Sequence, residues 1–357
     1  MLAEIVRLDG AHHREIAGDS DLADAVKLLA RAHQTAVWER TRHQLRLRSA
    51  LNEFFPVAVQ AFPDLPAPES LILLGRPPDP ARGAKLTRSQ IVSALTAARR
   101  HHVQDKADAL LALLRAPALR QPRATEAAYA TVVAAHVAMM VTLNEQIRQL
   151  GEVVAEKFGH HPAAEIYLSQ PGLGIVLAAR VLGEFGDDKT RFVAARARKN
   201  YSGQSPITRA SGKKTMVLAR FATNRRLGDA LHQQACSALT SSPGARAYYD
   251  AMRTRKIGHH AALRQLANRL VGIQHGCIKT CTLYDENTAW HIRGAAPIPL
   301  PLYKIHHGMS VRAEQLESIL RSHVRHGDLC LFWRPPASPI MCSGSSYRVP
   351  HRRGPTG

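Results

Sequence analysis

Residues 124–158 read ATEAAYATVVAAHVAMMVTLNEQIRQLGEVVAEKF, the longest segment of the chain with a continuous helical pattern. Apolar side chains recur in it at intervals of seven, at Val133, Met140, Ile147 and Val154. Two more follow three positions later, at Leu143 and Leu150. This spacing is typical of a coiled-coil seam, which needs a partner helix, although His136 and Lys157 interrupt it. An ordinary bundle helix is the alternative.

The candidate partner is an earlier segment, Ser20–Phe55, which either folds back on the long helix or leaves that helix to pair with a second copy. Ser20 and its acidic neighbours predict a helix start, and Pro56 predicts its end. Its second half is basic, and Arg42 and Arg46 are candidate phosphate contacts there, with a solvated face as the alternative. We expect a mainly α protein with a short antiparallel or dimeric coiled coil.

Other boundaries follow from prolines and charge. Residues 63–83 contain six prolines and predict a connector, followed by a helix that starts at Thr87 or Ser89 and another over 107–114. Beyond His291 the pattern collapses and predicts a disordered tail with one short helix over 311–324. We therefore divide the chain into 1–18, a coiled-coil region 19–162, a compact helical domain 163–290 and a tail 291–357.

The charge of the chain is strongly positive, with a formal net charge of +20. Between Lys189 and Arg226 there are eleven Lys or Arg residues and no Asp or Glu. Such a segment repels itself unless a polyanion neutralises it, and nucleic acid is the commonest cellular polyanion. The candidate contacts in and next to this segment are Arg198, Lys199, Arg209, Lys213, Lys214, Arg225 and Arg226.

A turn precedes the basic segment. Residues 166–182 read as helix, tight turn and helix, with Pro171-Gly172-Leu173-Gly174 at the turn. Glycines allow backbone amides to approach a phosphate, and the following helix presents its positive end to it. The pattern resembles a helix-hairpin-helix motif, and a plain helix-turn-helix in the core is the alternative.

A second group of residues could carry chemistry. Ser211 lies in a basic, glycine-containing loop, Ser211-Gly212-Lys213-Lys214, in which adjacent cations could lower the cost of forming its alkoxide and hold a phosphodiester. The alternative is a serine that only binds phosphate.

Residues 163–290 resemble the C-terminal domain of insertion-sequence transposases of the IS-one-ten family, and residues 19–158 resemble that family's coiled-coil region. The matching segments are Pro171–Gly174, Tyr201-x-Gly203-x-x-Pro206, Ser211-Gly212-Lys213, Arg225-Arg226-Leu227, Tyr248-Tyr249 and 261–270. The resemblance implies a DNA recombinase that uses a structured RNA to choose its sites. It also implies that the serine matching Ser211 forms a covalent link to DNA.

The same resemblance implies a preceding RuvC-like domain whose four acids, in the order Asp, Glu, Asp, Asp, hold Mg²⁺. Residues 2–9, LAEIVRLD, resemble the last helix of that domain. We therefore expect an N-terminally truncated transposase that lacks the metal-binding acids and is inactive alone. No other metal site is expected, because Cys277 and Cys281 have the wrong spacing for zinc. A non-catalytic nucleic-acid-binding protein, or an inhibitor of full-length transposase, is the competing hypothesis.

Partners and location follow from these patterns. DNA, a guide RNA and a second copy of the chain are the expected partners. Glu4 stands where a signal peptide would be apolar, and the apolar stretch 127–143 is short for a bilayer, so we expect no membrane association. The expected location is the cytoplasm, in association with the nucleoid.

Overall fold

The computed structural model describes residues 4, 7–8, 18–76, 79–117, 120–212, 214–221 and 223–290, with only the backbone at 214 and 215. These residues fall in one compact unit, Met1–Ile298. The predicted tail helix over 311–324 lies outside the described residues, as does most of 2–9. The described part is mainly α-helical, as expected.

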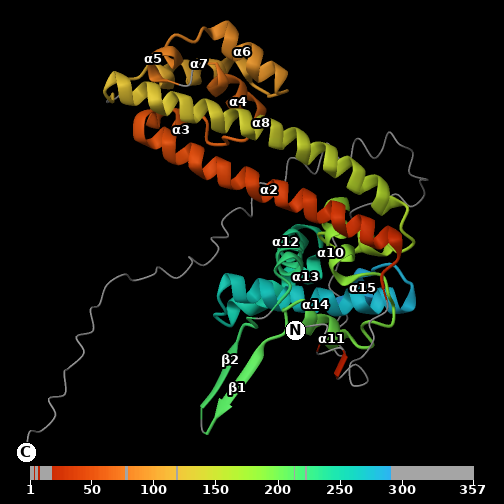
Figure 1. Cartoon of the computed structure of the whole chain (residues 1–357). Helices are drawn as coiled ribbons and strands as arrows, with labels where there is room; N and C mark the ends of the chain where they lie inside the picture. The colour runs from red at the N-terminus through yellow and green to blue at the C-terminus, as the bar shows by residue number, and fades with distance from the viewer. Residues whose placement is uncertain are drawn as a thin grey trace, which may run out of the picture. The chain divides into compact units, whose positions relative to one another are not determined.

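Two long helices, α2 (Asp21–Phe54) and α8 (Arg123–Gly159), lie side by side and run antiparallel (Figure 1). Arg40 donates to the side chain of Asn144 at 3.2 Å, and further along Phe54 stacks on Tyr129 with ring centroids 5.3 Å apart. The partner of α8 is therefore the earlier segment of the same chain. Ser20 caps α2 by accepting a hydrogen bond from the amide of Ala23, as its sequence predicts.

The heptad pattern of α8 is reflected in burial. Val133, Met140 and Val154 are fully buried, whereas Leu143 and Ile147 are only half-buried. Burial thus follows the heptad pattern only in part, and the fully buried positions are those that pack inside the fold. Supercoiling of this pair stays a prediction.

Two separate hydrophobic cores lie along the α2–α8 pair. The first joins the C-terminal part of α2 (Leu47, Leu51, Phe54) to the middle of α8 and to the short helices between them. The second joins Val26 of α2 and Phe158 of α8 to the C-terminal helices. The pair is therefore anchored at both ends.

The proline-rich connector contains helices, contrary to the sequence prediction. Helices α4 (Pro68–Gly75) and α5 (Pro80–Gly83) lie inside it and begin with proline, as does α3 (Pro56–Ala61), which precedes it. Proline is favoured at the first helical position because its missing N–H would be unpaired there anyway. Helix α6 (Arg88–Ala97) begins after Thr87 with a complete capping box, and α7 (Val103–Leu114) follows.

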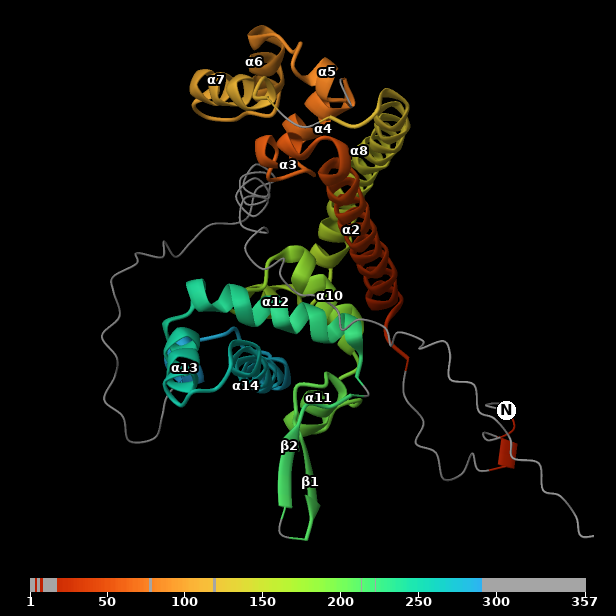
Figure 2. The same ribbon diagram turned by 90° about the vertical axis from the view of Figure 1, so that its left-hand side faces the viewer.

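The C-terminal part of the described chain packs helices around α10 and α14. Its helices are α9 (Ala164–Ser169), α10 (Ile175–Phe185), α11 (Ala195–Tyr201), α12 (Arg225–Ser241), α13 (Pro243–Thr254), α14 (His259–Thr280) and α15 (Glu286–Trp290). An antiparallel hairpin of β1 (Ile207–Ser211) and β2 (Lys214–Leu218) extends away from them (Figure 2). Sequence reasoning had treated this hairpin as a loop.

Helix α8 is long and apolar enough to cross a membrane by length and composition alone. The argument that its apolar stretch is too short was therefore wrong. The buried positions of the helix nevertheless pack against protein, because Val133, Val137 and Met140 belong to the first hydrophobic core.

Candidate nucleic-acid interface

The β1–β2 hairpin places Ser211 at its tip. In the register of the two strands Ser211 pairs with Lys214, and Arg209 pairs with Met216. Gly212 follows Ser211 with a φ of 55°, in the left-handed region that glycine adopts without strain. A Cβ placed on Gly212 would have no atom within 4 Å, so the turn lies in open space.

Because side chains alternate between the two faces of a strand, Ser211 shares one face of the hairpin with a cationic side chain. Ser211 and Arg209 are two residues apart on β1, so they point to the same side of the ribbon. The backbone of Lys214 pairs directly opposite Ser211. A hydroxyl and a guanidinium thus share one face.

This face is exposed and free of carboxylates. Arg209, Ala210 and Ser211 are exposed, and among the described residues Arg209 makes no hydrogen bond or ion pair. The nearest acids in the sequence are Asp188 and Asp229. Lys213 lies outside the described residues, and only the backbone of Lys214 is described. The exposed serine and arginine are what phosphate contact requires.

The turn between α9 and α10 has the helix–turn–helix outline that was predicted, but it faces inward. Pro171 and Leu173 are buried, and Gly172 has a φ of 76°. A Cβ on Gly172 would lie 2.5 Å from the carbonyl oxygen of Gln234 and 2.7 Å from the amide of Ala238, both in α12. Packing against α12 therefore explains this glycine. Gly174 is half-buried at the N-terminus of α10. It is therefore the part of the turn whose backbone remains available to bind a phosphate.

Several cations of the basic segment are structural. Arg198 is 5% exposed and lies over the Phe185 ring at 4.4 Å, so its predicted contact with nucleic acid is contradicted by its burial. Arg226 donates to the Arg31 carbonyl at 3.2 Å and to the Gln34 side chain at 3.1 Å. The sequence could not distinguish these arginines from available ones, because burial depends on tertiary packing.

The remaining candidates lie on other surfaces. Lys199 is half-buried beside Gly272 of α14, and burial, with the nearby Arg269, lowers its pKa. Arg225 is exposed at the start of α12. Arg42 and Arg46 are exposed one turn apart on α2, and Arg42 pairs with Glu39. Only Arg209 and Lys214 share the hairpin with Ser211 in the described part of the chain.

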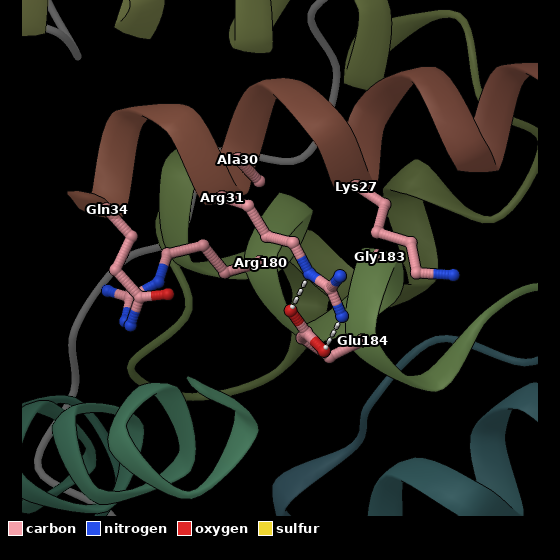
Figure 3. Close-up of a pocket in the computed structure, with 7 residues that line it drawn as sticks. All are labelled: Lys27, Ala30, Arg31, Gln34, Arg180, Gly183 and Glu184. Carbon is pink, nitrogen blue, oxygen red and sulfur yellow. Dashed lines mark hydrogen bonds and ion pairs between the residues drawn. The ribbon is translucent and has the colours of Figure 1, made fainter. Parts of the chain in front are cut away.

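A polar network joins α2 to α10 and α12 around a small pocket (Figure 3). Arg31 donates two hydrogen bonds to Glu184, at 2.7 and 2.9 Å, and Asn224 donates a third at 2.7 Å. Burial alone would raise the pKa of the Glu184 carboxyl, but these hydrogen bonds outweigh it and bring the pKa below its ordinary value. This network fixes α2 against α10.

The same network contains a second ion pair. Arg180 is 8% exposed and donates to Asp229 at 2.5 Å, and Asp229 also accepts from Gln34 at 3.0 Å. Burial lowers the pKa of Arg180 although Asp229 counteracts it. Every charge here has a protein partner, so the pocket is a structural junction between helices and offers little to a ligand.

A divalent metal needs several acidic, histidine or cysteine side chains close together. Within the described ranges, no three His, Cys, Asp or Glu side chains come together in a way that could hold a metal ion. The residues that the structure describes therefore do not fit the four-acid Mg²⁺ site that the resemblance implies, and no chemical step is derived through that metal.

Comparison with known proteins agrees with the motifs. Residues 164–250 match the family described as "Transposase IS116/IS110/IS902 family", and residues 1–56 match a DEDD-type transposase family. A mini-circle putative transposase for IS117 from Streptomyces coelicolor is 40% identical over 295 residues, which cover 81% of this chain and 71% of that protein. The chain belongs to the IS110 (IS-one-ten) transposase family.

Two further relatives carry only general names. An IS110 43.6 kDa protein from Streptomyces coelicolor is 26% identical over 290 residues, covering 80% of this chain and 70% of that protein. An IS900 42 kDa protein from Mycobacterium paratuberculosis is 32% identical over 160 residues, covering 44% and 40%. The family match over 164–250 includes the β1–β2 hairpin and the turn before α10.

Sequence reasoning missed one exposed residue of this region. Phe221, between β2 and α12, is 91% exposed. Its position among basic residues was the available signal, because aromatic side chains next to cations are common where proteins bind nucleic acid.

Proposed function

We propose that this transposase uses Ser211 as the nucleophile that attacks a DNA phosphodiester. The observation that carries the proposal is the position of Ser211 at the exposed tip of a hairpin, opposite Lys214 and on the same face as Arg209, which has no hydrogen-bond or ion-pair partner within the described residues. A hydroxyl that projects beyond the protein surface can reach a phosphate in a duplex, whereas a buried one cannot. The family membership supports DNA as the substrate.

The proposed step exchanges one phosphodiester for another. A bond forms between Oγ of Ser211 and phosphorus as one P–O bond of the DNA strand breaks, and the proton lost by the serine ends on the leaving oxygen. The cations of the hairpin stabilise the extra negative charge that the phosphoryl oxygens acquire. Because the product is again a diester, the step is reversible and a rejoined strand needs no external energy source.

The remaining parts of the proposal come from the resemblance. A structured RNA selects the sites, the protein acts as an oligomer, and it is located with the nucleoid. Divalent-metal chemistry belongs to the four-acid domain of the family, which the described residues do not reproduce. We therefore propose that the chain binds DNA but does not complete strand exchange alone, and that an intact relative can complement it.

The test is capture of the covalent intermediate. Labelled DNA carrying the element ends is incubated with Mg²⁺ and the chain, alone and mixed with an intact relative, and denaturing gels report protein that stays attached to DNA. We expect in the mixture an adduct with the mass of this chain, distinct from any adduct of the relative, and Ser211→Ala in this chain should abolish it. Ser205→Ala, in the same segment but outside the hairpin, should retain it.

A non-catalytic nucleic-acid-binding protein is the second candidate, favoured by the lack of a metal-binding group within the described residues. It predicts salt-dependent DNA binding and no adduct with Ser211 in either the single protein or the mixture. In that case the mixture should instead show reduced activity of the intact relative.

A further inference from the structure

Two exposed aromatic side chains lie near the base of the hairpin. Tyr201, at the end of α11, is 45% exposed, and Phe221, just after β2, is 91% exposed. Leaving a Phe ring in water forfeits about 2 kcal/mol of burial energy, so the position of Phe221 is costly unless something covers it. No aromatic or cation–π contact to Phe221 is present within the described residues.

The segments that carry these two rings are held together. Thr223 is so close to Gly203 that a Cβ on that glycine would lie 2.2 Å from the threonine methyl group, and the glycine has a φ of 74°. Asn224 donates to the hydroxyl of Tyr201 at 3.4 Å. Tyr201 is also packed on Phe192, with ring centroids 5.4 Å apart. The Tyr201 ring is therefore fixed, and Phe221 is placed two residues from the contact.

The surroundings indicate what covers the ring. No carboxylate occurs between Lys189 and Arg226, which includes both aromatics, and Arg196 and Arg225 are exposed. Within the part of the chain that the structure describes, neither of these two arginines makes a hydrogen bond or ion pair. This charge attracts a polyanion and disfavours a basic or purely apolar protein surface as the covering partner. A polyanion with flat apolar faces is a nucleic acid with an unpaired base.

We infer that Phe221 stacks on an unpaired DNA base next to the strand that Ser211 attacks, with Tyr201 as a fixed neighbouring ring. The inference rests on the proposed function, because both need DNA along the hairpin. The four residue steps from Ile207 to Ser211 span roughly 13 Å at the usual rise of a strand. Phe221 follows Leu218, the strand partner of Ile207, so the unpaired base lies several base steps from the attacked phosphate.

The experiment compares binding of three labelled nucleic acids by fluorescence anisotropy: a paired DNA duplex, one of its single strands and an RNA strand of the same sequence. The protein is used as wild type, Phe221→Ala, Phe221→Trp and the control Val217→Ala, whose side chain is 67% exposed on β2. Base stacking is worth about 1–3 kcal/mol, so Phe221→Ala should weaken single-stranded DNA binding about 5- to 150-fold. Duplex binding should change less than about twofold, since paired bases offer no free face.

Phe221→Trp should restore the affinity for single-stranded DNA, and Val217→Ala should behave as wild type. Equal losses on duplex and single strand, no loss on either, or a loss confined to RNA would overturn the inference. So would a change of molar mass of Phe221→Ala in light scattering, because the ring would then cover a protein interface. If the wild type binds no DNA, the proposed function fails as well. Duplex binding that decreases with salt, together with no effect of Phe221→Ala, would refute this inference alone.

Discussion

The hairpin and the junction between α2, α10 and α12 use the same kind of side chain in opposite ways. At the junction, Arg31 and Arg180 each face a carboxylate, Glu184 and Asp229 respectively. On the hairpin, Arg209 is exposed and has no acid within the basic segment. The first arrangement neutralises charge inside the protein, and the second leaves it for a ligand.

This difference divides the positive charge of the chain into two classes. Arg191 pairs with the buried Asp19, and Arg198 and Arg226 are bound within the fold. They come from the same carboxylate-free segment as Arg209, yet they contribute to stability. A basic composition therefore overestimates the surface that nucleic acid can use, and only the exposed members should affect binding.

Two glycines with positive φ compare the open turn of the hairpin with the packed α9–α10 turn. Gly172→Ala would drive a Cβ into the backbone of α12, and the left-handed conformation costs a further ~1–2 kcal/mol, so we expect a loss of about 3 kcal/mol or more in the free energy of unfolding. Gly212→Ala meets open space and should cost only about 1 kcal/mol. Urea denaturation of both variants measures the difference. Equal losses would contradict the packing of the α9–α10 turn.

The junction itself is tested by Glu184→Ala. Removing the carboxylate leaves Arg31 and Asn224 without their acceptor. We expect a loss of about 2–3 kcal/mol, below the ~3–5 kcal/mol of a fully buried pair, because the Arg31 side chain is 43% exposed. Glu145→Ala, which removes an exposed carboxylate paired to Arg148, should stay within about 0.5 kcal/mol of wild type. DNA binding should be unchanged in both, and a selective loss of binding in Glu184→Ala would show that the junction is part of the interface.

The junction should also give the protein a pH-dependent stability. Burial, with Arg180 and Arg40 nearby, lowers the pKa of His33 from 6.5 to about 4. The unfolded chain therefore binds a proton at His33 that the folded one does not, so stability is complete above pH 6.5 and decreases as the pH falls towards 4. Lowering the pH from 7 to 5 should reduce the free energy of unfolding by about 2 kcal/mol through His33. His33→Gln should flatten the dependence measured by denaturation, and the exposed His160→Gln should leave it unchanged.

Arg225 and Arg226 are adjacent in sequence, but Arg226 is bound within the fold and Arg225 is exposed. Arg226→Gln removes hydrogen bonds to α2 and a contact with the Trp38 ring, and should cost about 1 kcal/mol of stability. Arg225→Gln should leave stability within about 0.5 kcal/mol of wild type but reduce the salt dependence of DNA binding by about one counterion. Thermal denaturation and binding titrations report the two quantities. The reverse result would show that the exposed fraction of a cation does not decide its role.

Much of the helical fold could be predicted from local signals. The Ser20 cap, the Pro56 stop, the Thr87 capping box and the heptad pattern of α8 each depend on residues near one another in the sequence, and the structure contains all four elements. The helices inside 63–83 were missed because proline was interpreted as a breaker, although it also begins helices.

The site was predicted less completely, for a physical reason. Ser211 and Arg209 were identified, but the hairpin that displays them was not. The β-branched or apolar residues on either side of Gly212, such as Ile207 and Val217, were its signal. The burial of Arg198 and the inward packing of Gly172 depend on helices distant in sequence, which no local pattern reveals.

The central claim, that the Ser211 hairpin lies against DNA phosphates, is tested most directly by the salt dependence of duplex binding. For the wild type, the logarithm of the binding constant should fall steeply and linearly with the logarithm of salt concentration. In the double variant Lys213→Gln/Lys214→Gln the slope should be shallower by about 1.8, since each phosphate contact contributes about 0.9. An unchanged slope with unchanged folding would mean that the hairpin does not contact DNA, and would contradict the account.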